Sequence, residues 1–317
     1  MITEPTVFIL GAGASAHYGF PLGNQYKTRI LDVLCQDRIG NITWESLNIV
    51  KNERIRVRDE FMEQKETIDH YLIKKEQNKD TEALRIGKTA IAGVILEAEK
   101  KSKLTPLSLN WYEILWEAMK PRSLEEFEKN NIAFITFNYD RSLEYFLHCK
   151  LRSEFHEHDE MAVGKWMLQS QEGGGSIYWY HIYGLPAQPY FWKFKHSDAV
   201  DYGVLNMEAL QTADKRIELQ GARETAKRLY SDNVLPQIEC ASKIVFLGFG
   251  FAEENLRLLT EGSPFRNKTV WATTKGLGCR RRRNIDYFFK ASGVKQFISE
   301  DSGCFRFLKK HQTTIFR

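Results

Sequence analysis

The sequence predicts an α/β fold in which a Rossmann-like parallel sheet carries helices on both faces. Short apolar runs rich in β-branched and aromatic residues recur along the chain and alternate with segments of helical spacing. The first run, at residues 7–10, ends in the turn Gly11-Ala-Gly13, as a buried parallel strand that leads into a helix commonly does. Because parallel neighbours need a long crossover between them, this alternation favours a parallel sheet.

Five further apolar runs predict the rest of the sheet. They lie at residues 132–137, 177–182, 243–249, 269–274 and 294–299. The spacing of apolar residues predicts intervening helices, among them 22–34, 141–151 and 206–219.

Residues 44–103 are charged, favour helices and contain no convincing strand. Within them Phe61, Ile68 and Leu72 fall on one helical face. We expect a single domain spanning residues 1–317, with a helical insertion over about 44–130. The insertion could cap a pocket or mediate assembly, and the sequence leaves both roles open.

Composition excludes several classes of protein. The net charge of +4 is too small to indicate a dedicated nucleic-acid binder, and no direct sequence-specific nucleic-acid binding is expected. The five cysteines form no C-x-x-C pair, so neither a zinc ribbon nor a disulfide framework is expected. We find no signal peptide and no apolar run of about 18 residues. These features favour a soluble, reduced, cytoplasmic protein with no membrane span and no metal site.

The glycine turn matches G-x-G-x-x-A through Gly11, Ala12, Gly13 and Ser15. Gly11 permits a tight turn, and Gly13 lets the backbone approach a pyrophosphate. A tight strand–helix turn without a ligand is the alternative. A dehydrogenase would need an acidic residue at the end of a second strand about 20 residues on. Because no strand precedes Asp32, we reject that function.

Four separated segments together resemble the sirtuins. They are GAGASAHYGFP (11–21), TFNYD (136–140), HIYG (181–184) and GFGFAEEN (248–255), so the resemblance covers residues 7 to about 260. Two features depart from deacylating sirtuins: the zinc-binding cysteine pairs are missing, and Leu22-Gly23-Asn24 replaces Asp-Phe-Arg. The chain is therefore more similar to the zinc-free sirtuin-like domains of bacterial antiphage systems, which hydrolyse NAD⁺.

The resemblance implies catalytic roles for Asn138 and His181. Asn138 would position the ribose or the attacking water, and His181 would act as the general base. Asp140 would accept hydrogen bonds from the nicotinamide carboxamide. Each residue also has a structural alternative. His181 could be a structural histidine, and Asn138 could hydrogen-bond to the backbone of its own loop. Asp140 could cap the helix that follows.

The same resemblance implies a cofactor-binding set along the glycine turns. Ser15 would donate to a phosphate, and Asn255 would contact the adenosine ribose. The turn at residues 248–255 could equally be an ordinary strand–helix turn that binds no ligand and leads into a helix with acidic residues in its first turn. The complete expected set is Gly11, Ala12, Gly13, Ser15, Phe20, Pro21, Asp140, Gly248, Gly250 and Asn255.

The function we expect is an NAD⁺ glycohydrolase that releases nicotinamide and ADP-ribose and depletes NAD⁺ in antiviral defence. Such activity needs a gate, so we expect a homo-oligomer, a separate sensor protein (an ATPase, a helicase or an Argonaute-like protein), or both. A zinc-free deacylase or ADP-ribosyltransferase is one alternative. A non-catalytic subunit that senses NAD⁺ or ADP-ribose is another.

Four further motifs favour ordinary roles. The segment 156–160 (HEHDE) lacks a further metal-ligand pattern, and the basic cluster 280–283 has no second basic stripe beside it. The aromatic segment 189–194 (PYFWKF) indicates core or a pocket lid, and the glycine-rich segment 170–176 a surface loop.

Overall fold

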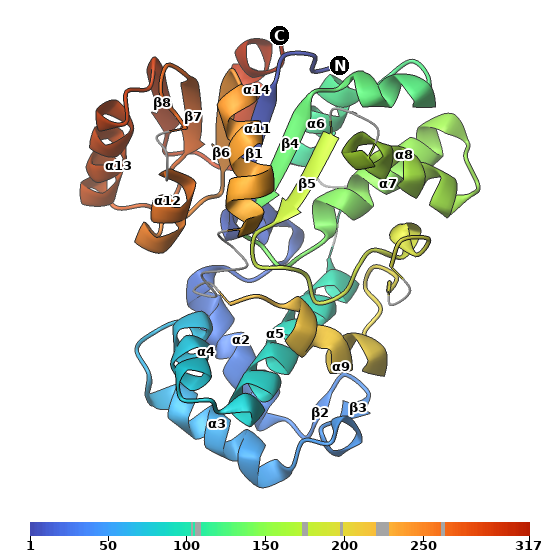
Figure 1. Cartoon of the computed structure of the whole chain (residues 1–317), viewed down its shortest axis with the longest axis vertical. Coiled ribbons are helices and arrows are strands. Elements are labelled where there is room, and N and C mark those ends of the chain that lie inside the picture. The colour runs from blue at the N-terminus through green and yellow to red at the C-terminus, as the bar shows by residue number, and fades with distance from the viewer. Residues whose placement is uncertain (103, 105–108, 173–176, 197–198, 220–227, 261–263) are drawn as a thin grey trace.

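The computed structural model describes residues 1–102, 104, 109–172, 177–196, 199–219, 228–260 and 264–317. A six-stranded, all-parallel sheet forms the upper half of the molecule in Figure 1, with strand order β5-β4-β1-β6-β7-β8. Its strands are β1 (Thr6–Leu10), β4 (Ile132–Thr136), β5 (Ile177–His181), β6 (Lys243–Leu247), β7 (Thr269–Thr273) and β8 (Gln296–Glu300). All six predicted strands are confirmed, with ends that differ by one or two residues.

The strand order makes the carboxyl ends of β1 and β6 the point where the chain reverses direction across the sheet. From β1 the chain moves outward through β4 to β5, and it then returns to β6 on the other side of β1. In the register, Leu10 lies beside both Thr136 and Leu247. In open parallel sheets ligands bind at such a reversal, outside the carboxyl ends of the strands.

The helices are distributed over the whole chain. They are α1 (Ala12–Ser15), α2 (Gly23–Cys35), α3 (Lys51–Glu63), α4 (Ile68–Gln77), α5 (Thr81–Lys101), α6 (Trp111–Met119), α7 (Ser142–Phe155), α8 (Glu160–Glu172), α9 (Met207–Arg216), α11 (Leu235–Cys240), α12 (Glu253–Thr260), α13 (Cys279–Ala291) and α14 (Cys304–Ile315). Side-chain caps fix several starts: Thr67, Asp80, Asn110 and Asn206 each accept a hydrogen bond from a backbone N–H in the first turn.

Alternate residues of each strand enter two separate cores, which confirms that helices cover both faces of the sheet. Ile9 and Phe246 pack with residues of α11 and α13. Phe8 and Leu247 pack instead with residues of α6, α7 and α14. Because the central strands β4, β1, β6 and β7 are buried on both faces, their sequences are nearly continuous apolar runs, whereas the edge strand β8 is partly exposed.

A helical layer lies beyond the carboxyl edge of the sheet, in the lower half of Figure 1. It contains α2 to α5 and a small antiparallel pair, β2 (Arg38–Ile39) and β3 (Ile42–Thr43). Helix α9 also packs on α5 in this layer. Helix α6 instead packs on α14 beside the sheet, so the chain between β1 and β4 divides between the layer and the sheet.

Candidate functional site

A cavity of about 1030 Å³ lies between the carboxyl edge of the sheet and the helical layer. This volume is at the upper end of the usual range for ligand sites, about 300–1000 Å³. Segments that follow β1, β4, β6, β7 and β8 form one wall, and α2 and α4 contribute to the opposite one. Every predicted site residue except His181 lines it: Gly11, Ala12, Gly13, Ser15, Phe20, Pro21, Asn138, Asp140, Gly248, Gly250 and Asn255.

The turns that follow β1 and β6 pack against each other through their glycines. A Cβ at Gly13 would lie 2.8 Å from the Cα of Gly248, and a Cβ at Gly248 would lie 2.0 Å from the nitrogen of Ala14. The Gly13 N–H donates to the Gly248 carbonyl at 2.9 Å. The contact between the two backbones therefore requires glycine at both positions even without a ligand. Gly250 differs, because a Cβ there would meet no atom within 4 Å.

Asn138 connects the end of β4 to the glycine turn. Its Nδ2 donates to the Gly11 carbonyl at 3.0 Å and to the Ser15 hydroxyl at 3.2 Å. Its Oδ1 has no hydrogen-bond partner among the described residues. The side chain is thus held rigidly at the cavity wall, with one acceptor left for a ligand or a water molecule.

Asp140 lines the cavity and also bonds to the first residue of α7, although the N-cap position of that helix is Arg141 and not Asp140 as expected. One carboxylate oxygen accepts from the Ser142 N–H at 3.1 Å and from the Ser142 hydroxyl. Burial raises the pKa of Asp140, against hydrogen bonds from Ser142 and Ser15 that lower it. The site therefore contains a buried carboxyl group that takes up a proton more readily than an exposed aspartate.

His181 lies at the end of β5, behind Asn138 and outside the cavity lining. Its Nε2 lies 2.5 Å from Oε1 of Glu144, and its Nδ1 lies 3.1 Å from the Asn138 carbonyl. Burial lowers the pKa of His181, but Glu144, the Asn138 carbonyl and the charge of Asp140 outweigh it, so the net shift is upward. Because both partners are acceptors, this geometry suits an imidazolium, which donates protons. The base role expected for His181 would need a different contact.

Asn255 lies in the first turn of α12 and is buried at the cavity wall. Its Oδ1 accepts a hydrogen bond of 2.5 Å from the hydroxyl of Tyr183, which also lines the cavity. Tyr183 follows β5 by two residues, so this bond joins the ends of β5 and β6 across the site.

Sequence reasoning missed two groups of cavity residues. Lys275, Ser302 and Arg306 follow β7 and β8. Their position at strand ends was a usable signal, because ligands bind at the carboxyl ends of parallel strands. Tyr26 and Asp69 come from the helical layer, and no sequence pattern indicates which face of that layer meets the sheet.

A buried ion pair joins the helical layer to the segment that carries Asn138 and Asp140. Arg141 contacts both carboxylate oxygens of Glu99 in α5, at 3.0 and 2.6 Å, and both side chains are almost fully buried. Arg141 also donates to the backbone carbonyls of Gln188, Val200 and Asp201. It thereby fixes the β4–α7 turn relative to α5 and the 188–201 segment.

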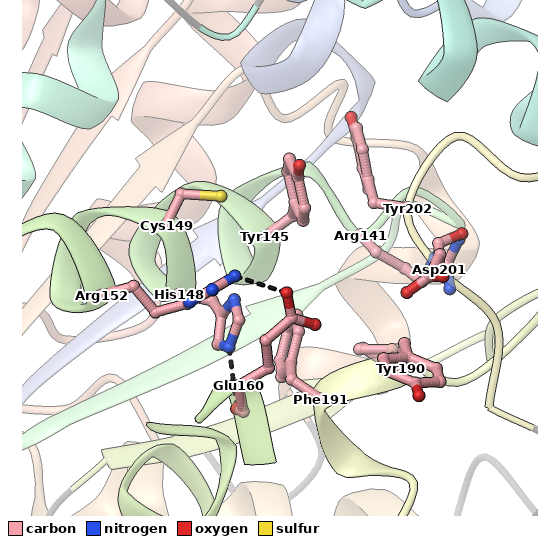
Figure 2. Close-up of a pocket in the computed structure, with 11 residues that line it drawn as sticks. Arg141, Tyr145, His148, Cys149, Arg152, Glu160, Tyr190, Phe191, Asp201 and Tyr202 are labelled. Carbon is pink, nitrogen blue, oxygen red and sulfur yellow. Dashed lines mark hydrogen bonds and ion pairs between the residues drawn. The ribbon is translucent and has the colours of Figure 1, made fainter. Parts of the chain in front are cut away.

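A second cavity, of about 320 Å³, lies between α7, α8 and the segment that follows β5. Figure 2 shows Arg152 bound to the carboxylate of Glu160, and His148 bound to the Glu160 backbone carbonyl. The His148 ring also stacks on Phe191 at 4.0 Å. Many polar groups of this smaller cavity thus already bond to one another, which makes it a weaker candidate for a nucleotide site.

The remaining motifs fall outside the large cavity. Phe191 and Trp192 of the aromatic segment are buried in the core, which confirms that expectation. Arg280, Arg281 and Arg283 are exposed at the start of α13. Residues 173–176 of the predicted glycine-rich loop lie outside the described residues. Across the described ranges, no three His, Cys, Asp or Glu side chains group as a metal site would require, and no helix has the length and apolarity to cross a membrane.

Fold and site together define a Rossmann-like α/β protein with a nucleotide-sized cavity at the reversal point of its sheet. No protein-family model matches the chain, and comparison with curated proteins gives no match. The function of the chain must therefore be inferred from the site itself.

Proposed function

We propose that the chain is a sirtuin-like NAD⁺ glycohydrolase that hydrolyses NAD⁺ to nicotinamide and ADP-ribose. The observation that carries the proposal is that one cavity unites Asn138, Asp140 and both glycine turns. These segments are more than a hundred residues apart in the sequence, and each carries one of the motifs that resemble sirtuins.

The reaction requires the protein to orient NAD⁺ and the attacking water and to tolerate positive charge on the ribose. The bond between nicotinamide and C1′ of the ribose breaks, nicotinamide leaves as a neutral base, and positive charge develops on the ribose as in glycoside cleavage. The oxygen of a water molecule then bonds to C1′, and one of its protons is released to solvent water, so that NAD⁺ and water give nicotinamide, ADP-ribose and a proton. In this proposal Asn138 Oδ1 orients that water, and Asp140 accepts hydrogen bonds from the nicotinamide carboxamide.

In this scheme His181 positions the backbone of Asn138 and does not itself contact the substrate. The imidazolium holds the Asn138 carbonyl at 3.1 Å and is itself held by Glu144. The general-base role inferred for His181 from the sequence stays a prediction, and it requires the ring to lose the proton that it shares with one of these acceptors.

One observation favours a second candidate, a non-catalytic subunit that senses NAD⁺ or ADP-ribose. The predicted base does not line the cavity, and both amide hydrogens of Asn138 are already bonded within the protein. Binding without turnover would need no free base.

Gating belongs to the proposal, since an unregulated enzyme of this kind would deplete the NAD⁺ of its own cell. We propose a gated effector of bacterial antiviral defence, controlled by homo-oligomerisation or by a separate ATPase, helicase or Argonaute-like sensor.

Turnover of NAD⁺ by the purified protein tests the function, with nicotinamide release followed by chromatography. We expect release without an acylated substrate and its loss in Asn138→Ala and His181→Ala. Asn284→Ala, at an exposed position of α13, is the matched control and should retain activity. Bound but intact NAD⁺ under every condition, including high protein concentration, would favour the sensor. Release that requires an acylated peptide would favour the deacylase.

A further inference from the structure

The end of the cavity at β7 and β8 is lined by two cationic side chains, Lys275 and Arg306, and by one acidic side chain, Asp301. Lys275 follows β7, Arg306 lies in the first turn of α14, and both line the cavity. Neither side chain forms an ion pair with a carboxylate of the described chain. The acidic side chains beside them are committed elsewhere, because Asp301 contacts Arg282 at 2.6 Å and Glu300 contacts His311 at 2.8 Å.

The two cations converge on the start of α14. The Nζ of Lys275 lies 4.0 Å, and its Cδ 3.7 Å, from a Cβ built on Gly303, the N-cap of that helix. Gly303 provides no capping side chain, and the first turn contains no acidic residue. The positive end of a helix is unfavourable for cations. A bound anion would compensate both the helix end and the two side chains.

An unsatisfied hydroxyl group lies at the same place. The Oγ of Ser302 is buried and has no hydrogen-bond partner among the described residues, and Ser302 also lines the cavity. Buried hydroxyl groups are nearly always hydrogen-bonded in folded proteins. Two unpaired cations, an uncapped helix start and a free hydroxyl are the groups that bind a phosphate.

We propose that this end of the cavity is a phosphate site that receives the 2′-phosphate of NADP⁺. The inference rests on the proposed function, which places nicotinamide beside Asn138 and Asp140 and so directs the adenosine towards β6, β7 and β8. In Rossmann-type sites an acidic side chain near the adenosine ribose selects NAD⁺, whereas a cationic side chain there accommodates NADP⁺. Lys275 and Arg306 are cationic side chains of the kind that accommodates NADP⁺.

Binding of adenosine 2′,5′-bisphosphate, compared with AMP by titration calorimetry, tests the site. Neither ligand contains the nicotinamide bond, so turnover does not interfere. We expect the bisphosphate to bind more tightly than AMP by about tenfold or more, because hydrogen bonds to charged groups contribute that much. Lys275→Ala and Arg306→Ala should each remove most of this difference. Lys309→Ala, an exposed cation of α14 outside the cavity lining, removes the same charge and should leave it unchanged.

Equal affinities for the two ligands would overturn the inference. So would an equal loss for both ligands in the Lys275 and Arg306 variants, because the cations would then hold the shared 5′-phosphate. The kcat/KM for NADP⁺ and NAD⁺ separates this inference from the proposed function. Hydrolysis of NAD⁺ without a preference for NADP⁺ refutes only the 2′-phosphate site. Cation-dependent binding of the bisphosphate, with neither dinucleotide hydrolysed, supports the site and refutes the hydrolase.

Discussion

Replacing Glu99 by Gln should destabilise the protein strongly, because it breaks the buried pair that holds the β4–α7 turn. Glutamine keeps the shape of the side chain but removes the negative charge that faces Arg141. The guanidinium would keep its three backbone acceptors and lose the ionic partner that contacts it at 3.0 and 2.6 Å. The variant would therefore contain a buried cation without a counter-charge.

The expected loss is about 3–5 kcal/mol in the free energy of unfolding, as is typical when one partner of a buried ion pair is removed. Glu97→Gln is the matched control on the same helix. Its partner Lys101 lies 3.5 Å away and is exposed, so that substitution should cost no more than about 1 kcal/mol. Urea denaturation with linear extrapolation measures both values.

The reasoning would be refuted if the two substitutions had equal effects. A further test replaces both partners, in Glu99→Met with Arg141→Met. Removing both charges should recover part of the loss, because the uncompensated cation is then gone. A double variant that is less stable than Glu99→Gln would show that the backbone contacts of Arg141, rather than its charge, dominate.

Two further predictions concern the glycine turns and the buried histidine. Gly13→Ala should lower the melting temperature in the absence of ligand, because its Cβ would lie 2.8 Å from the backbone of the turn that follows β6. Gly250→Ala is the control and should leave the melting temperature unchanged. Equal melting temperatures of the two variants would contradict the packing of the two glycine turns. The raised pKa of His181 means that its pair with Glu144 stabilises the protein most below the unfolded pKa of about 6.5, and that this stability is lost as the pH rises through the folded pKa. Unfolding free energies between about pH 6 and pH 9 should therefore show a deficit of Glu144→Gln that shrinks as the pH rises, and a deficit independent of pH would refute the imidazolium assignment.

Much of the fold could be predicted because its central strands are buried on both faces. Runs such as 243–249 are apolar at nearly every position, and the glycine turn marks where the first strand stops. The helical layer was harder to predict. Its helices have clear apolar faces, but amphipathicity does not reveal what each face contacts, and α9 packs on α5 across more than a hundred residues of sequence.

The candidate site, like the fold, was predictable only in part from the sequence. Residues at strand ends were predictable, and Asn138, Asp140 and Gly248 do meet in one cavity. The orientation of His181 was not predictable, because it depends on Glu144, which lies on a neighbouring helix and 37 residues away. The cationic end of the cavity was missed because Lys275 and Arg306 follow no motif and come together only through the pairing of β7 with β8.

Short segments of the sequence suffice to predict the fold class, the strands of the sheet and the chemical character of the turns at their carboxyl ends. Those properties depend on local apolar patterning and on the backbone freedom of glycine. Which side chains face the cavity, and which form hydrogen bonds outside its lining, depends on tertiary packing. Burial, pairing and pKa depend on residues brought together from distant parts of the chain, as the contacts of Arg141 with Glu99 and of His181 with Glu144 show.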